Sequence, residues 1–248
     1  MKSFLGFVFT LLLGGLLIFS LSNNDVFPQF GEADVAERVS SSYINRDVTE
    51  DPGEIVYLEA TNLESGAANI VTAIVADYRS FDTLGEVTVL FVSSLGVALL
   101  LAGANKKRME LEYTPNFMLR IGSRALFGII LMTGVFVTVH GHLTPGGGFP
   151  GGTMIASSIL LLYLADDQFR TKVKGFKVLE SVAGSIYVII GIVGLFIADY
   201  FLVNFLDNGT LGTLFSAGII PIVYVLIGLK VGSEISGIID NFLTEEGV

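Results

Sequence analysis

Long apolar runs separated by short polar segments dominate the hydropathy pattern of this chain. A helix needs roughly 20 apolar residues to cross a bilayer, and six runs reach or approach that length. We expect these runs to be membrane-spanning helices: residues 4–21, 84–102, 126–139, 153–165, 179–198 and 211–229. The predicted fold class is therefore an all-α integral membrane protein with about six transmembrane helices.

The first run has an alternative interpretation as a cleaved signal peptide, because it follows Lys2 at the start of the chain. Its 18 apolar residues are long for a signal peptide, and no small-x-small cleavage pattern follows them. We therefore favour a first span that is retained.

Polar segments between the runs predict two amphipathic helices. Residues 23–80 are acidic, and a stripe at helical spacing predicts a helix of about four turns on the membrane surface or against a partner: Ala67, Ile70, Val71, Ile74, Val75 and Tyr78. Residues 55–58 predict a short strand. A second stripe over residues 235–243 predicts either a short amphipathic helix or a continuation of the last span, in which Pro221 predicts a kink.

Lysine and arginine in short loops mark the cytoplasmic side of a membrane protein. With six spans, the basic residues fall on one side: Lys2, Lys106, Lys107, Arg108, Arg120, Arg124, Arg170, Lys172, Lys174, Lys177 and Lys230. This pattern predicts a multi-pass protein of the cell (plasma) membrane with both termini in the cytoplasm. The acidic segment and residues 141–152 and 199–210 then face outward.

Composition narrows the chemistry. Of the 248 residues, 52% are hydrophobic and 15% are charged, against about 25% charged in a soluble domain. Without cysteine, and with two histidines, the chain has no disulfide framework or thiolate nucleophile and is a poor host for zinc or an iron–sulfur cluster. The net charge of −10 argues against a nucleic-acid partner. We expect no catalytic residues and no metal site in this chain.

Residues 141–152 are rich in glycine and proline, at Gly141, Pro145, Gly146, Gly147, Gly148, Pro150, Gly151 and Gly152. Glycine and proline disfavour a regular helix, so we expect irregular backbone between two apolar runs of about 14 residues each. Short, interrupted apolar segments are typical of transport sites. A tight outer hairpin between two helices is the alternative.

Carboxylates gather at the mouth of the second span, where Asp77, Asp82 and Glu86 stand close in sequence. Ionisable groups at membrane depth are functional candidates, so we interpret these three as part of a cation or proton route. The alternative is a helix start, in which Thr83 and Glu86 form a capping box and Asp82 faces the positive helix end.

His140 and His142 lie at the outer end of the third span. Imidazole titrates near neutral pH, which suits a proton relay, although hydrogen bonds to loop carbonyls would explain the pair equally well. Histidines two apart on a helix point in different directions, which disfavours a shared metal ion.

Lys230 closes the predicted sixth span, and we expect its ammonium to reach the interface or to serve as a proton-relay group. Glu234 stands four residues later and could pair with it, in the less favourable order for such a pair. Glu180 is expected at the interface near the inner end of the fifth span.

Several motifs resemble a known family. Gly-Ser-Arg-Ala-Leu-Phe-Gly at 122–128, the histidine and glycine stretch at 140–152, and Ile-Gly-Leu-Lys-Val-Gly at 227–232 are similar to the B subunit of Mrp-type (Mnh-type) multisubunit cation/proton antiporters. Asp-Tyr-Arg-Ser-Phe-Asp-Thr-Leu-Gly-Glu at 77–86 is similar to the C-terminal piece of the antiporter A subunit. This predicts two modules, a two-span A-like module over residues 1–108 and a four-span B-like module over residues 109–248.

The resemblance implies an accessory subunit of a sodium/proton translocating module. Similar modules occur in archaeal membrane-bound hydrogenases and sulfur-reducing complexes, and the lack of a large antiporter portion favours such a respiratory complex over a stand-alone antiporter. The implied partners are A/D-like, C, E, F and G antiporter subunits, with hydrogenase-like and iron–sulfur subunits that carry the clusters. The implied transported ions are Na+ and H+. A purely structural scaffold is the other alternative, in which the glycines serve close helix packing.

Overall fold

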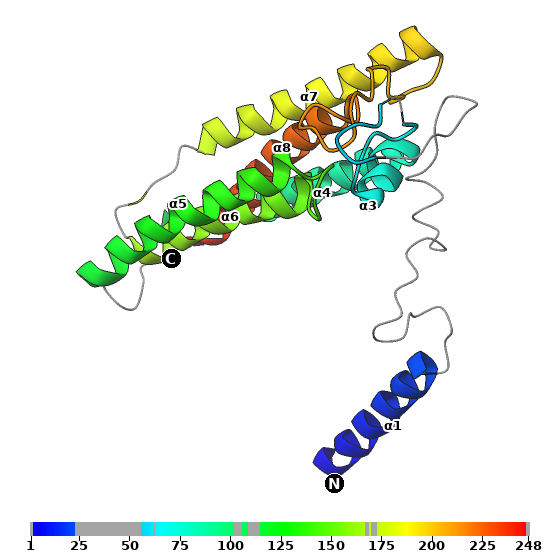
Figure 1. Ribbon diagram of the computed structural model, residues 1–248. Coiled ribbons are helices and arrows are strands. Elements are labelled where there is room, and N and C mark those ends of the chain that lie inside the picture. Colours follow the sequence, from blue (N-terminus) through cyan, green and yellow to red (C-terminus); the bar gives the residue numbers. More distant parts are fainter. Residues whose placement is uncertain are drawn as a thin grey trace. The chain divides into compact units, whose positions relative to one another are not determined.

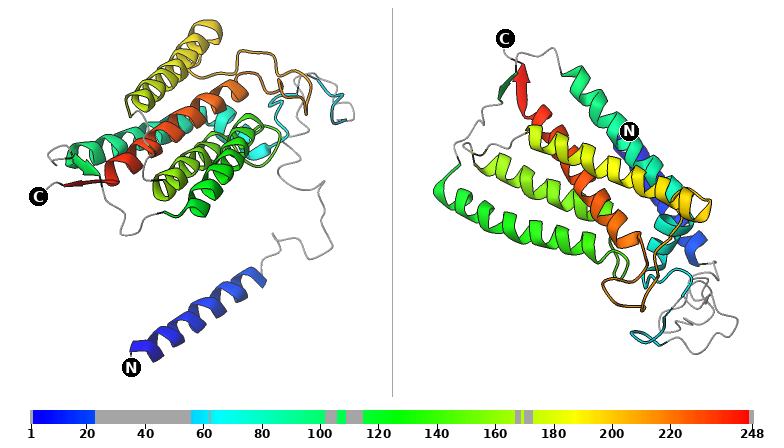
Figure 2. Two further views of the ribbon diagram at one scale, coloured as in Figure 1. Left: turned by 90° about the vertical axis from the view of Figure 1, so that its left-hand side faces the viewer. Right: turned by 90° about the horizontal axis from the view of Figure 1, so that it is seen from above.

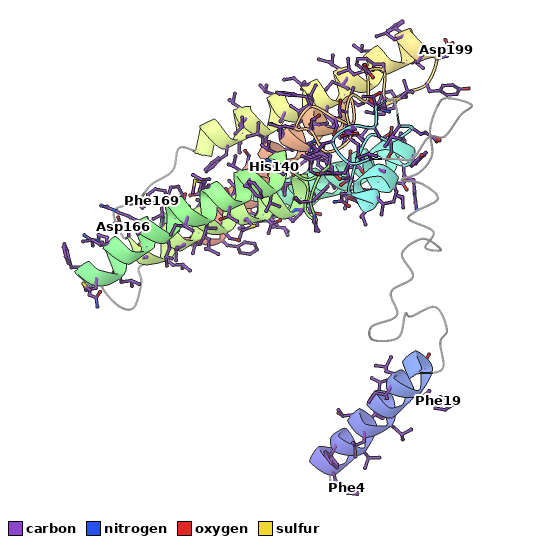
Figure 3. The ribbon with its side chains drawn as sticks, viewed as in Figure 1. Phe4, Phe19, His140, Asp166, Phe169 and Asp199 are labelled. Atoms are coloured by element: carbon purple, nitrogen blue, oxygen red, sulfur yellow. The ribbon has the colours of Figure 1, made fainter. Side chains whose placement is uncertain are left out.

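The computed structural model describes residues 2–22, 56–61, 63–101, 106–108, 115–166, 169 and 173–246. Contacts divide the chain into two units, residues 1–42 and 43–248, which are described separately. The first unit contains helix α1 (Lys2–Ser22), in which Phe4 and Phe19 mark opposite ends (Figure 3). The large apolar side chains that the structure describes on α1 are exposed, and a helix that is apolar all round suits a lipid environment.

The second unit holds five long helices: α4 (Ser80–Leu100), α5 (Phe117–Val139), α6 (Gly148–Ala165), α7 (Val173–Ala198) and α8 (Ile220–Phe242) (Figure 1). Each is long and apolar enough to cross a membrane, and α1 adds a shorter apolar stretch at Gly6–Ser20. The predicted all-α, multi-pass membrane fold is confirmed. One short antiparallel pair, β1 (Lys106–Arg108) with β2 (Thr244–Glu246), is the exception within the described residues (Figure 2).

Helix α8 is the centre of this bundle. It packs against α4, α5, α6 and α7, and α5 also packs along α6. In its most apolar stretch 61% of the residues are buried inside the chain, against 11% in α4 and 22% in α7. Helices α4 and α7 therefore present most of their surface to lipid or to another protein.

The bundle has two distinct ends. At one of them, the loop end, residues 56–61, 63–79, 140–147 and 199–219 pack together through backbone hydrogen bonds such as Leu58 N to Leu211 O and Asn69 N to His142 O. The opposite end, the basic end, carries the β1–β2 pair and Arg124 with Asp166. Asp199 and Asp166 mark the two ends in Figure 3. The membrane side that each end faces stays a prediction.

The predicted bounds of the last span were wrong. Residues 211–219 are turns, and the helix begins at Ile220 after Ala217 and Gly218, whose φ angles are +67° and +58°. Pro221 lies in the first turn of α8, where a backbone N–H would have no carbonyl of the helix to bond. Proline therefore fits the start of α8 and does not kink the helix. The helix continues to Phe242. This confirms that the apolar stripe over residues 235–243 belongs to a continuation of the last span.

The glycine stretch is also more regular than predicted. Residues 148–152 are the first turns of α6, and α5 begins at Phe117, so the two spans have 18 and 23 residues. Pro150 is tolerated in the first turn. The expectation of irregular backbone holds only for residues 141–147.

The first amphipathic helix exists in a different form. It consists of α3 (Ile70–Thr72) and the π-helix η1 (Ala73–Tyr78), which leads through Arg79 into α4. Of the predicted stripe, Ala67 is buried and Ile70 is partly buried, whereas the other four members are exposed: Val71, Ile74, Val75 and Tyr78. Residues 57–59 form a turn and not the predicted strand, and Ile55 lies outside the described residues.

Candidate functional site

An ion pair is buried on α8. Lys230 Nζ lies 2.5 Å from Glu234 Oε1, and the two side chains are 10% and 0% exposed. Lys230 Nζ also lies 4.9 Å from the centre of the Phe91 ring of α4, a cation–π geometry. With α8 beginning at Ile220, Lys230 is its eleventh residue and Glu234 its fifteenth of 23, so the pair sits at mid-helix. The expectation that Lys230 reaches the interface was wrong.

A groove between α4 and α7 opens onto this pair. It has a volume of about 570 Å³, and Lys230 forms part of its floor. Phe91 and Thr88 line it from α4, and Glu180 and Tyr187 line it from α7. A second hollow of about 180 Å³ shares Phe91 and Glu180 and extends to Asn241 at the basic end.

Glu180 of α7 is half-buried and faces the carboxyl group of Glu234. The second oxygen of that carboxyl, Glu234 Oε2, is buried and accepts no hydrogen bond from the residues that the structure describes. Two carboxyl groups and one ammonium therefore meet within the bundle. The sequence predicted Glu180 at the membrane interface and did not predict this contact with Glu234.

Buried hydroxyl groups connect the loop end to the bundle. Tyr224 of α8 donates to Thr72 Oγ1 at 3.0 Å, and Thr72 Oγ1 donates to Gly141 O at 2.7 Å. Tyr187 of α7 donates to the carbonyl oxygen of Ser80 at 3.2 Å. These bonds attach the start of α4 and the glycine loop to α7 and α8.

His142 is fully buried and His140 is partly exposed. His142 Nε2 lies 3.4 Å from Thr213 O, and burial lowers the pKa of His142 against the opposing effect of hydrogen bonds to Thr213 and Leu214. His142 Nδ1 has no partner among the described residues. His140 Nδ1 lies 3.1 Å from Phe136 O, and its ring stacks on that of Phe136. The imidazole rings of His140 and His142 therefore lie in separate environments.

The three predicted carboxylates are spread along one helical segment. Burial, with Glu64 nearby, raises the pKa of Asp77 to about 6. Asp82 pairs with Arg79 and is half-exposed, and Glu86 is exposed on α4. Among the described residues no hydrogen bond or ion pair joins these three to one another or to His140.

The capping-box alternative at this helix was wrong. α4 begins at Ser80, so Thr83 and Glu86 both lie inside the helix. Thr83 Oγ1 instead donates to the carbonyl oxygen of Val75 across the η1–α4 junction. Glu86 is left without a capping role.

The glycine motif divides into a loop and a packing face. Pro145 and Gly146 are exposed, and Gly146 and Gly147 have φ angles of +156° and +135°, which L side chains rarely adopt. Gly148, Gly151 and Gly152 of α6 face α5 and α8 so closely that a Cβ at any of them would lie within 3 Å of a neighbouring atom. This close packing agrees with the scaffold alternative for these three glycines.

A separate charged cluster closes the basic end. Asp166 is 2% exposed, and its carboxylate pairs with Arg124 at 2.6 Å and Arg120 at 3.6 Å. Tyr163 donates to Asp240 Oδ1 at 2.8 Å, which joins the end of α6 to α8. This cluster fixes α5, α6 and α8 to one another. No group of three or more histidine and acidic side chains with the geometry to hold a metal occurs in the part of the chain that the structure describes.

The sequence interpretation missed the importance of Glu180 and Glu234. The error came from the predicted span at residues 211–229, which placed Lys230 at a helix end. The i, i+4 spacing of Lys230 and Glu234 within apolar sequence was the available signal. The partner on α7 needed the three-dimensional structure.

Two family models match different parts of the chain. One describes a domain related to the MnhB subunit of Na+/H+ antiporters and matches residues 118–237. The other describes MbhE, the E subunit of MBH, and matches residues 32–110. The boundary predicted near residue 108 falls between α4 and α5, and the two segments pack into one bundle through α4 and α8. That boundary stays a prediction.

Relatives and solved structures resemble most of the chain. Uncharacterized protein MJ1307 of Methanocaldococcus jannaschii is 32% identical over 205 residues, which cover 68% of this chain and 74% of that protein. A chain in the structure of the membrane-bound sulfane sulfur reductase (MBS), an archaeal respiratory membrane complex, is 42% identical, with a TM-score of 0.73 and 99% of both chains covered.

A chain of the Mrp complex from Dietzia sp. DQ12-45-1b is 27% identical, with a TM-score of 0.60. That match covers 73% of this chain and 21% of the Dietzia chain. The chain thus belongs to the same family as MJ1307, and it carries a segment like the MbhE subunit of MBH followed by a domain related to the MnhB subunit of Na+/H+ antiporters.

Proposed function

We propose that this chain is an accessory membrane subunit of the Na+/H+ translocating module of a respiratory complex related to the membrane-bound sulfane sulfur reductase. The observation that carries this proposal is the similarity over 99% of both chains to a subunit of that complex. The match to the Mrp complex covers 21% of the other chain, so a respiratory complex is favoured over a stand-alone antiporter.

The exposed apolar surface supports a role within a larger assembly. Helices α4 and α7 are mostly uncovered, with exposed side chains such as Leu99, Leu100 and Phe196. The partners proposed here are the other antiporter-type subunits, A/D-like, C, E, F and G, and hydrogenase-like subunits that hold iron–sulfur clusters. The cofactors then belong to those subunits, and Na+ and H+ are the transported ions. The basic end is assigned to the cytoplasm by the positive-inside rule.

Among the predicted route residues, Asp77, Asp82, Glu86, His140, His142 and Lys230 keep that role as part of this proposal. Two observations support Glu86 as a route residue: it does not cap the start of α4, and its side chain is exposed on that helix. Lys230 is supported because it is buried in the span beside a groove.

Isolation of the native complex through a tag on this chain tests the proposal. We expect antiporter-type subunits together with hydrogenase-like and iron–sulfur subunits, and sodium-dependent proton movement after reconstitution into proteoliposomes. Antiporter subunits alone would instead indicate a stand-alone antiporter. A complex without any sodium-dependent proton movement would contradict the proposed function.

A further inference from the structure

The ion pair on α8 lies where a charge is costly. Lys230 and Glu234 are in the middle of a membrane-spanning helix, at 10% and 0% exposure. Desolvation of two charges offsets most of their attraction, and replacement of a buried pair by apolar residues is often neutral or stabilising. Stability alone therefore does not account for this pair, and ionisable groups at membrane depth are functional candidates.

A second carboxyl group makes the charge balance uneven. Glu180 faces Glu234, so one ammonium serves two carboxyl groups. Two carboxylates at one site cannot both be ionised without a large cost when solvent is excluded. A single proton between Glu180 and Glu234 removes the excess charge and supplies a hydrogen bond to Glu234 Oε2, which otherwise has no partner among the described residues.

The other elements around the pair contribute one cation, the exposed Lys177, and one further carboxylate, Glu86. From α7, Lys177 lines the smaller hollow and Tyr187 the larger one. From α4, the Phe91 ring covers Lys230, and Glu86 lies near enough to act electrostatically on Tyr187. From α6, Gly152 and Ile155 meet α8 near Gly232, and neither carries a charge.

Two adjoining hollows lead to these groups. The smaller hollow begins near Lys177 and Asn241, and both hollows share Phe91, Glu180 and Ser181. Their volumes of about 180 and 570 Å³ exceed the space that one water molecule needs, and hydroxyl groups such as Ser181 and Thr88 line the walls. Glu180 therefore stands between the groove and the buried carboxyl of Glu234.

We propose that Glu180, Lys230 and Glu234 form a proton-exchange site on the floor of the α4–α7 groove. In the loaded state Lys230 is an ammonium and one proton is shared by the two carboxyl groups, so the three residues are neutral together. On release, the carboxyl O–H bond breaks and the proton passes to water in the groove. The three residues then carry one negative charge, which a monovalent cation in the groove balances.

This inference rests on the proposed function for its physiological meaning, but the site itself is measurable without transport. Infrared difference spectra of the purified complex, recorded across a pH titration, should show a protonated-carboxyl band that shifts in heavy water. Glu234→Gln and Glu180→Gln should each remove that band. Asp199→Asn is the matched control, because Asp199 is exposed at the loop end and its φ of +63° suits asparagine.

Transport by the reconstituted complex provides the second measurement. Glu180→Gln and Glu234→Gln should reduce sodium-dependent proton movement at least about a hundredfold, the lower end of the range for loss of an essential acid–base group. The double variant Lys230→Leu/Glu234→Leu should assemble, because an apolar pair replaces an ionic one, and should also fail to transport. If Glu234→Gln does not assemble, Glu180→Gln decides, since Glu180 is only half-buried.

The possible results separate the two proposals. Wild-type transport by the double leucine variant, or an unchanged carboxyl band in both glutamine variants, would overturn the proton-exchange site. A wild-type complex that moves no protons with sodium, but loses its carboxyl band in Glu234→Gln, would contradict the proposed function and support the site.

Discussion

Substitution of Gly148 by alanine tests whether the glycine motif holds α6 against α8. A Cβ at this position would lie 2.6 Å from Ile227 Cβ and 2.8 Å from the carbonyl oxygen of Tyr224. Carbon atoms pack best about 3.5–4.0 Å apart, so the two helices would have to separate by about 1 Å. Overpacking of this kind costs about 1–3 kcal/mol of the free energy of unfolding.

The matched control is Gly128→Ala on α5. No neighbouring atom lies within 4 Å of the position that the alanine methyl group would take at Gly128, so the new side chain meets open space there. Alanine improves helix propensity by up to about 1 kcal/mol, so Gly128→Ala should be neutral or slightly stabilising. The comparison separates packing from propensity, because both variants make the same chemical change within a helix.

Equilibrium unfolding of the purified chain in mixed micelles, with SDS as denaturant and circular dichroism as readout, gives the two free energies. We expect Gly148→Ala to be less stable than Gly128→Ala by about 1–3 kcal/mol, the overpacking cost, because the gain in helix propensity is common to both variants. Equal stability of the two variants would show that α6 and α8 do not pack at this distance, and would refute the packing role of the motif.

Two further predictions concern carboxylates. The pKa of Asp77 is raised from 3.8 to about 6, so the folded state binds this proton more tightly, and stability rises as pH falls through about 6. Asp77→Asn removes this half-buried charge and should raise the free energy of unfolding more at about pH 7.5 than at about pH 5, with a difference between the two of about 1–2 kcal/mol at most; an equal change at both would contradict the shift. Glu86→Gln should reduce sodium-dependent proton movement by about a hundredfold, the lower end of the range for loss of an acid–base group. The complex should still assemble, because Glu86 is exposed and caps no helix. Unchanged transport would remove Glu86 from the route.

The apolar runs predicted most of the helices correctly because bilayer thickness imposes a length that can be counted in the sequence. α4 begins four residues before its predicted range at 84–102, and α7 begins six residues before its predicted range at 179–198 and ends with it. The grouping of Arg124 with the β1 segment at one end of the bundle also follows from the distribution of basic residues. Side-chain type alone determines these features.

Hydropathy failed where backbone conformation decided the outcome. Residues 211–219 are as apolar as a span, yet Gly212, Ala217 and Gly218 have positive φ angles, which end any helix. Glycines at 148–152 suggested a loop, but their missing side chains allow α6 to approach its neighbours. Such contacts repay the poor helix propensity of glycine, and propensity scales do not include them.

By itself the sequence determined that the chain is a multi-pass helical membrane protein, because transfer of apolar side chains into lipid depends on composition and length. Only the tertiary structure decided which residues come into contact. Glu180 and Glu234 are 54 positions apart in sequence (234 − 180), and they face each other because α7 packs along α8. Burial, and with it the energy of a charge, depends on which neighbouring helices exclude water, and that is a property of the packed bundle.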